Sequence, residues 1–441
     1  MVTLKKNISS FQVILIGFMS VVLLGALLLM LPISTRDGIV TPFNETAFTA
    51  TSAVCVTGLV VQDTATYWSP FGQVIILILI QIGGLGVVSA ASAFSIMIGQ
   101  RIGLKYRSIM QDAISAPKVG GIVRITKFII TITLILETIG ALVMMPTFCK
   151  EFGAKGIWKA VFHSVSAFCN AGFDVMGSGK GKFVSLTQYA DNPVINITIM
   201  SLIIIGGIGF LVLHDIKTNK FRVKHYTLQS KIVLVTTLIL ILVPALIFLN
   251  TDFYELPLGK GIMASLFQSV TPRTAGFNTM DVTQMSGGNK ALTIILMLIG
   301  GSPGSTAGGM KTTTITLLAI NAISIFKRNP ETEIFRRRVN HNIIRTAATL
   351  LMMYISLFAV SGIVISSIEQ IDIDKCFYET ASALGTVGLT QGITTQLGVV
   401  SQVILMTLMF LGRVGGLTII FAAISKSGKS SKLPQEDIIV G

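Results

Sequence analysis

The sequence predicts an all-α polytopic membrane protein, in which four covalently linked helix–pore-loop–helix repeats surround one central pore. Of its 441 residues, 51% are hydrophobic and only 12% are charged, against about 25% charged residues in soluble domains. Long apolar runs alternate with charged segments, and one short glycine-containing pattern occurs four times. Only helices and closed barrels satisfy their backbone in hydrocarbon, and barrel-type alternation is absent, so the runs are expected to be helices.

Eight apolar runs are expected to span the membrane, because about 20 helical residues cross the hydrocarbon layer. They form four pairs: residues 11–33 with 74–97, 125–145 with 194–213, 232–249 with 291–325, and 343–365 with 399–424. Between the members of each pair lies room for a half-helix of roughly ten residues, which is too short to span and is expected to re-enter. The predicted repeats are residues 1–112, 113–220, 221–338 and 339–441.

The positive charges follow the same alternation. The net charge is +14, and 22 of the 34 Lys and Arg residues lie in every second loop and at the two ends of the chain. An excess of Lys and Arg in alternate loops is typical of the cytoplasmic side, so both termini are expected in the cytoplasm. Membrane orientation therefore accounts for the excess of basic over acidic residues, and no nucleic-acid partner is expected.

One glycine recurs in each predicted re-entrant segment. The four glycines are separated by 114, 104 and 112 residues, and a bulky residue stands ten positions before each of them. The glycines are Gly58, Gly172, Gly276 and Gly388. A near-constant period with the same local pattern indicates four quasi-equivalent loops around one axis.

These segments have the chemistry of a cation pathway. Rings of backbone carbonyls can replace the hydration shell of an ion, and glycine adopts the required dihedral angles at little steric cost. The C-terminus of each half-helix adds partial negative charge, and no acidic residue stands just before or at the glycines, which argues against a carboxylate ring. The expected ligands are the carbonyl groups of Val56, Thr57 and Gly58; Asn170, Ala171 and Gly172; Thr274, Ala275 and Gly276; and Thr386, Val387 and Gly388.

The apolar run at 291–325 is interrupted by a polar, glycine-rich stretch. Proline and five glycines cannot hold a stable helix, and such a stretch must face protein or a water-filled cavity. Below the glycine segments it is placed to obstruct the pore. The predicted gate comprises Gly300, Gly301, Ser302, Pro303, Gly304, Ser305, Thr306, Ala307, Gly308, Gly309 and Lys311, together with Arg413 from the last apolar run.

Two features of this region leave alternatives open. Arg413 either pairs with backbone carbonyls for structure or places a positive charge below the glycine segments, since a charge inside a membrane faces a cavity or a partner. The sequence of residues 304–312 nearly matches the pattern of a phosphate-binding loop, but Met310 interrupts the required Gly-Lys-Ser/Thr run. We therefore expect no nucleotide or other cofactor in this chain, and no arrangement of an enzyme active site is visible.

Glycine clusters also follow each glycine segment by about 25 to 35 residues, at 83–86, 206–209, 300–301 and 415–416. Small residues allow close helix packing in membranes, and hinges below the pore are the alternative interpretation. Glu137, which lies in the middle of an apolar run, receives no role from the sequence.

The four glycine segments, the stretch at 300–309 and the Gly-Arg-Val-Gly-Gly pattern at 412–416 resemble the Trk/Ktr/HKT superfamily of potassium transporters over essentially the whole chain. The resemblance is strongest to Ktr membrane subunits of the KtrB or KtrD type from Gram-positive bacteria. It implies potassium (K⁺) uptake through the filter, with Gly58 at the position associated with potassium rather than sodium, and with 300–309 as an intramembrane gating loop. Dependence on sodium (Na⁺) is left open.

The same resemblance implies partners. We expect a homodimer in the bacterial plasma membrane, gated by a separate cytosolic nucleotide-binding ring of the KtrA or KtrC type that binds ATP or ADP. The alternative function is an alternating-access secondary cation transporter, because such folds also contain repeats and broken helices. Two halves with a single midplane site are typical of those transporters, whereas four glycines in register favour a pore.

Overall fold

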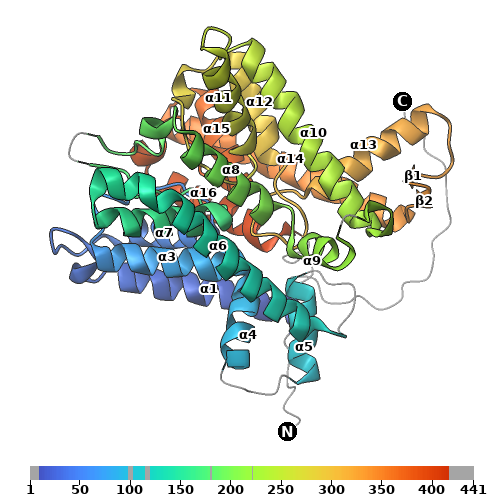
Figure 1. Cartoon of the computed structure of the whole chain (residues 1–441), viewed down its shortest axis with the longest axis horizontal. Coiled ribbons are helices and arrows are strands. Elements are labelled where there is room, and N and C mark those ends of the chain that lie inside the picture. The colour runs from blue at the N-terminus through green and yellow to red at the C-terminus, as the bar shows by residue number, and fades with distance from the viewer. Residues whose placement is uncertain (1–8, 98–102, 115–119, 179–180, 221, 417–441) are drawn as a thin grey trace.

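The computed structural model describes residues 9–97, 103–114, 120–178, 181–220 and 222–416. Within these ranges the protein is a bundle of α-helices with one short β-hairpin (Figure 1). The predicted all-α class is confirmed. In Figure 1 the blue and teal helices lie in the lower part of the view and the yellow and orange helices in the upper part, with the red last helix between them.

The first helix of each repeat is long and apolar enough to cross a membrane by itself. These helices are α1 (Ser10–Leu29), α6 (Ile122–Phe152), α10 (Leu228–Asn250) and α14 (His341–Glu369). In the most apolar stretch of each, only 17–33% of the residues are buried inside the protein. Many of the remaining apolar side chains are exposed, among them Leu24, Leu142 and Leu246, as on a membrane helix that contacts lipid.

A shorter helix follows each long one and carries the glycine segment at its C-terminal end. These half-helices contain 12 to 14 residues: α2 (Phe43–Val54), α7 (Lys155–Phe168), α11 (Leu258–Val270) and α15 (Ile373–Gly385). The predicted half-helices are therefore present in all four repeats.

The second helix of each repeat is α3 (Pro70–Leu85), α8 (Pro193–Gly207), α12 (Gly287–Leu298) or α16 (Val399–Val414). Three of them begin at a hydrogen-bonded N-cap, formed by Ser69, Asn192 and Ser286, whose side chains accept bonds from backbone N–H groups of the first turn. Further helices continue three of these segments: α4 (Val87–Met97), α9 (Phe210–Asn219) and α13 (Thr312–Phe326), while α5 (Leu104–Ala113) lies between the first two repeats.

The prediction of uninterrupted runs at 74–97, 194–213 and 399–424 was wrong, and residues 417–424 of the last run lie outside the described part of the chain. The first run breaks at Gly86, where φ is +80°, and the second at Gly209, where φ is +96°, so that α8 and α9 meet at 95°. Gly415, with φ +88°, likewise ends α16. Residues with side chains rarely adopt this conformation, whereas glycine does so readily.

Other glycines of the same clusters serve close packing. A Cβ atom on Gly83 or Gly206 would overlap the backbone at the end of a neighbouring half-helix, and so would one on Gly412, which precedes the last cluster. The packing interpretation is thus confirmed for Gly83 and Gly206, while Gly86, Gly209 and Gly415 change the direction of the chain.

Each half-helix also packs against the second helix of the preceding repeat. The pairs are α7 with α3, α11 with α8, α15 with α12, and α2 with α16. The last pair joins the end of the chain to its beginning, and the Asn44 amide donates a 3.2 Å hydrogen bond to Gln402 across it. The four repeats therefore close into a ring.

Candidate ion pathway

The four glycine segments (residues 56–58, 170–172, 274–276 and 386–388) share one backbone conformation. The residue two positions before each glycine has a positive φ, at Val56 (51°), Asn170 (58°), Thr274 (69°) and Thr386 (53°), and the glycines have φ between 68° and 91°. The residue between them has no positive φ. Alternation of left- and right-handed residues turns successive peptide groups to the same side of the chain, and side-chain-bearing residues hold this conformation only where the surroundings impose it.

The glycines stand next to one another around a closed ring. A Cβ atom on Gly58 would lie 3.2 Å from the Cα of Gly172, and one on Gly172 would lie 3.1 Å from that of Gly276. The same construction gives 3.2 Å from Gly276 to Gly388 and 3.0 Å from Gly388 back to Gly58. Only glycine fits at these positions. Each constructed Cβ also overlaps the carbonyl oxygen of the residue before the next glycine, so backbone oxygens from all four repeats meet here.

Hydroxyl groups at the ends of the half-helices hold the segments in place. The Gly58 and Gly388 N–H groups each donate a 3.0 Å hydrogen bond to the hydroxyl oxygens of Ser52 and Ser382. In the other two repeats the Ser166 hydroxyl donates to the Phe173 carbonyl at 2.7 Å, and the Thr271 hydroxyl donates to the Phe277 carbonyl at 2.6 Å. Sequence reasoning missed these residues, although three of the four hydroxyls stand six positions before the glycine.

Within the described part of the chain, no three His, Cys, Asp or Glu side chains are arranged to hold a metal ion. The glycine segments instead offer backbone carbonyls. Neighbouring segments also touch through side chains, since the Asn170 amide lies 3.2 Å from the Thr274 hydroxyl.

Residues 299–311 form the interruption between α12 and α13 and are named the intramembrane loop. It crosses the fold beside the glycine segments and contacts other repeats. The Ser302 N–H donates to the Gly207 carbonyl at 3.0 Å, and the Gly309 N–H donates to the Gly412 carbonyl at 3.1 Å. The Thr306 hydroxyl donates to the Phe168 carbonyl, at the end of half-helix α7, at 3.0 Å. Sequence reasoning placed the interruption correctly.

The loop also lies directly against the fourth glycine segment. A Cβ atom on Gly308 would overlap the side chain of Thr386, and one on Gly309 would lie 3.1 Å from the Gly385 carbonyl. The predicted gate residues and the predicted ligands are therefore neighbours in space.

Arg413 joins the intramembrane loop to the first repeat. Its guanidinium group donates hydrogen bonds to the carbonyls of Thr306 and Gly83, and to that of Gly84 at 3.0 Å. Gly83 and Gly84 belong to the last turn of α3, where the helix dipole places partial negative charge. The interpretation that this arginine pairs with backbone carbonyls is confirmed, whereas its role as a positive charge below the glycine segments stays a prediction.

Lys311 is a second basic residue beside the intramembrane loop. Its ammonium group donates to the Ala307 carbonyl at 2.9 Å and the Gly308 carbonyl at 3.3 Å. Lys311 and Arg413 line one cavity of 140 Å³, which Asp112 and Phe210 also line. Two basic side chains and one carboxyl group therefore line the same cavity.

Two buried carboxylic acids lie close to the chain next to the second and fourth glycine segments. Glu137, on α6, lies 3.3 Å from the Gln81 amide and 3.8 Å from the sulfur atom of Cys169, the residue before the second segment. Glu379, on α15, accepts hydrogen bonds from the hydroxyls of Thr390 and Thr394 in the chain that follows the fourth segment. Sequence reasoning left Glu137 without a role and did not identify Glu379.

The fold and this site define a multi-pass membrane protein with re-entrant loops in a closed four-repeat ring. The sequence model of the TrkH family, described as "Cation transport protein", matches residues 9–433. The chain therefore belongs to the TrkH family of cation transport proteins, and the predicted superfamily is confirmed.

Individual relatives match over nearly the full length. The chain is 39% identical to the potassium/sodium uptake protein NtpJ of Enterococcus hirae, over 99% of this chain and 98% of the relative. It is 36% identical to the Ktr system potassium uptake protein B of Bacillus subtilis, over 98% and 96% of the two chains, and 31% identical to protein D of that system, over 99% and 98%.

A solved structure shows the same fold. The potassium transporter TrkH from Vibrio parahaemolyticus superposes with a TM-score of 0.74 at 20% identity, covering 96% of this chain and 86% of that one.

Proposed function

We propose that this protein takes up potassium through a central pore, in which the carbonyls of the four glycine segments form the selectivity filter. The observation that carries the proposal is the closed ring in which each filter glycine excludes a Cβ because the next glycine lies beside it. Relatives named as potassium or potassium/sodium uptake proteins support the choice of ion. Sodium, as a second or coupled ion, belongs to the same proposal.

The intramembrane loop is proposed to be the gate. It touches the second and fourth repeats directly, and Arg413 connects it to the first. A loop that contacts two repeats directly and a third through Arg413 is well placed to close a shared passage.

We further propose that the chain acts as the membrane subunit of a Ktr-type complex in the bacterial plasma membrane, with both termini in the cytoplasm. The complex would contain a dimer of this chain and a cytosolic ring that binds ATP or ADP. The names of two relatives place them in a Ktr system. Co-purification of the chain with such a ring, and its release or retention on adding ATP or ADP, tests this part.

The alternating-access alternative is less well supported. A secondary transporter of that kind moves one half of its fold against the other around one midplane site. Here the contacts between half-helices and neighbouring repeats are repeated at all four boundaries, which gives no division into two moving halves.

The test is growth at low potassium of a bacterium that lacks its own uptake systems, supplied with this chain and its cytosolic partner. The native chain should restore growth. Gly58→Ser and Gly276→Ser should weaken growth and admit sodium, because a left-handed residue other than glycine costs about 1–2 kcal/mol and the added atoms enter the ring. Gly288→Ser is the matched control, since nothing lies within 4 Å of a Cβ there.

The outcomes separate the hypotheses. If the filter variants lose potassium selectivity while the control keeps it, the carbonyl filter stands. If the native chain never moves potassium, or if the filter variants keep normal selectivity, the glycines are packing residues and the proposed pathway is wrong.

A further inference from the structure

The segment between α13 and α14 forms an exposed hairpin on a buried base. Strand β1 (Glu333–Ile334) pairs antiparallel with β2 (Arg337–Arg338), and Ile334 lies opposite Arg337. Ile334 and Val339 are buried and pack into one cluster with side chains of α10 and α14. In Figure 1 the hairpin lies at the edge of the molecule, beside the C-terminal part of α13.

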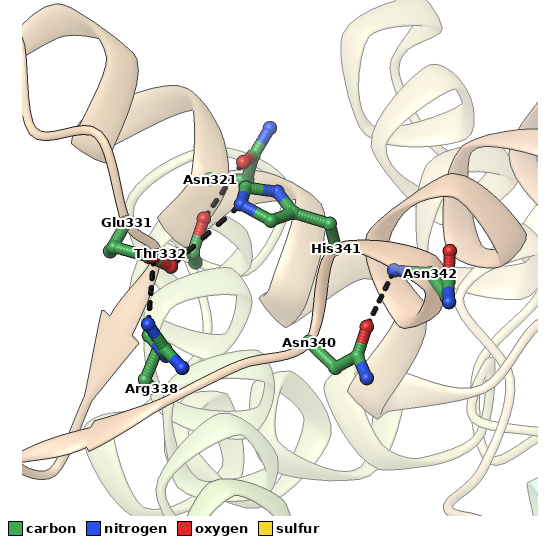
Figure 2. Close-up of polar contacts among 7 residues, drawn as sticks. All are labelled: Asn321, Glu331, Thr332, Arg338, Asn340, His341 and Asn342. Carbon is green, nitrogen blue, oxygen red and sulfur yellow. Dashed lines mark hydrogen bonds and ion pairs between the residues drawn. The ribbon is translucent and has the colours of Figure 1, made fainter.

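Polar contacts fix the two ends of this hairpin. Figure 2 shows Glu331 between Arg338 and His341, and the shorter of these contacts joins Arg338 Nη1 to Glu331 Oε1 at 2.9 Å. The Thr332 hydroxyl donates a 2.8 Å hydrogen bond to Asn321 on α13. The base of the hairpin is thus held at a defined place next to α13.

The turn contains unusual residues. Phe335 and Arg336 form the two-residue connection, and their φ angles are +49° and +61°. Turns with two positive φ angles strongly prefer Asn-Gly, Asp-Gly or Gly-Gly, and a bulky residue in this conformation is an outlier. Turn stability therefore does not account for the presence of these two residues. The Phe335 side chain is 50% exposed, and Arg336 is exposed as well.

The surroundings of the tip are basic and begin where an apolar surface ends. Residues 327–345 contain six Lys or Arg residues against two Glu residues. The preceding helix finishes with Ile325 and Phe326, which are 63% and 84% exposed. Because an apolar surface of this kind contacts hydrocarbon, the basic segment that follows it starts at the level of the lipid headgroups.

We propose that the hairpin tip, formed by Phe335, Arg336 and Arg337, binds anionic phospholipid headgroups at the membrane surface. Guanidinium groups form strong hydrogen bonds with phosphate, and the attraction of basic side chains to anionic lipid acts within a Debye length of the surface. The exposed phenylalanine ring enters the boundary between headgroups and acyl chains. The inference rests on the family membership and not on which cation the pore carries.

The test uses the full chain carrying Phe335→Trp, reconstituted in vesicles of phosphatidylcholine with increasing fractions of phosphatidylglycerol that has brominated acyl chains. Emission of the unsubstituted chain, which keeps Trp68 and Trp158, is subtracted. The added tryptophan should be quenched as phosphatidylglycerol increases. Adding Arg336→Gln and Arg337→Gln should raise the fraction of phosphatidylglycerol needed for half-maximal quenching at least about fivefold. This is the effect expected from the loss of roughly one arginine at an anionic surface.

Two further variants serve as controls in the same Phe335→Trp chain. Arg222→Gln with Lys224→Gln neutralises exposed cations in another loop, beside the exposed Val223, and should leave the quenching curve unchanged. Arg336→Lys with Arg337→Lys keeps the charge and should preserve most of the quenching.

The proposal is overturned if the added tryptophan is not quenched in phosphatidylglycerol, or if the glutamine pair leaves the curve unchanged. It is also overturned if the loop control shifts the curve as much as the glutamine pair does. If the added tryptophan is not quenched by lipid and its emission changes only when a soluble protein is added, the hairpin binds a protein partner instead.

Discussion

The residues that shape the central ring are held by their neighbours. Val56, Asn170, Thr274 and Thr386 share a left-handed conformation although each has a side chain. The hydroxyls of the half-helix ends supply hydrogen bonds that favour it. At the residue scale, the conformation of the glycine segments therefore depends on single polar atoms behind them.

Replacing Ser382 by alanine should lower the preference of the pore for potassium over sodium several-fold. The substitution leaves the Gly388 N–H without its hydrogen-bond acceptor, and an unsatisfied buried donor costs about 1–3 kcal/mol. Tracer flux of both ions into proteoliposomes measures the ratio. Ser367→Ala, on the exposed face of α14, is the control, and an unchanged ratio in S382A would show that the hydroxyl does not support the filter.

Glu379→Gln should reduce the thermal stability of the purified chain by about 1–3 kcal/mol, the cost of a lost buried hydrogen bond. The carboxylate accepts bonds from Thr390 and Thr394, and the amide has only one acceptor oxygen. Thermal unfolding in detergent with saturating potassium gives the measurement. Glu255→Gln, at an exposed position, should leave the transition in place; equal stability of E379Q and the native chain would contradict the assignment.

Part of this residue-level arrangement was visible in the sequence. The ring glycines were predictable, because a pattern at nearly constant spacing marks equivalent positions. The positive φ values of Val56 and Thr386 were not, because no residue type signals a conformation imposed by its surroundings. Glu379 was missed for a similar reason: its partners lie beyond the glycine segment and meet it only in the folded chain.

At the scale of elements, broken helices are the main feature of the fold. The interruption at 299–311 was predictable from its proline and glycines, whereas the breaks at Gly86 and Gly209 were not. Glycine is common in unbroken membrane helices, so its presence alone does not indicate a break. The break at Gly86 ends α3 inside the protein, and Arg413 binds two carbonyl groups of its last turn.

Arg413→Gln should increase potassium flux in the absence of any cytosolic partner. The change removes a positive charge near the passage and weakens the attachment of the intramembrane loop. A unit charge acting across several ångströms at an effective dielectric constant of about 20 contributes on the order of 2 kcal/mol, or a rise of tenfold or more in flux.

Rubidium uptake by proteoliposomes measures this effect. Arg413→Lys, which keeps the charge, separates electrostatics from hydrogen bonding, and Arg222→Gln controls for a general loss of positive charge. A flux in R413Q no higher than in the native chain would exclude the barrier role of this arginine.

At the scale of the whole molecule, the ring closes through contacts between the first and last repeats. Half-helix α2 packs against α16, just as α11 packs against α8 at the middle of the chain. Helices far apart in sequence thus close the ring. We expect packing between helices to hold the repeats together more than the covalent links at their boundaries do.

Co-expression of residues 1–220 and 221–441 as separate chains should therefore yield a complex that co-purifies in detergent. Each half lacks the neighbour of one of its half-helices, α2 in the first and α11 in the second, and the other half provides it. A tag on one half and detection of the other measures the association. Gln402→Leu, which removes the bond to Asn44, should weaken recovery modestly, and two halves that fold but never associate would contradict the packing argument.

The intramembrane loop belongs to one repeat but reaches toward all the others. It contacts the second and fourth repeats, and Arg413 ties it to the first, so a second copy of the loop would occupy the same space. Four identical subunits, each carrying this loop, would place four loops in that one space. Joining the units in one polypeptide removes that conflict, because one repeat can carry the loop while the other three lack it. An ancestor assembled from four identical subunits could therefore not have carried this loop in its present arrangement.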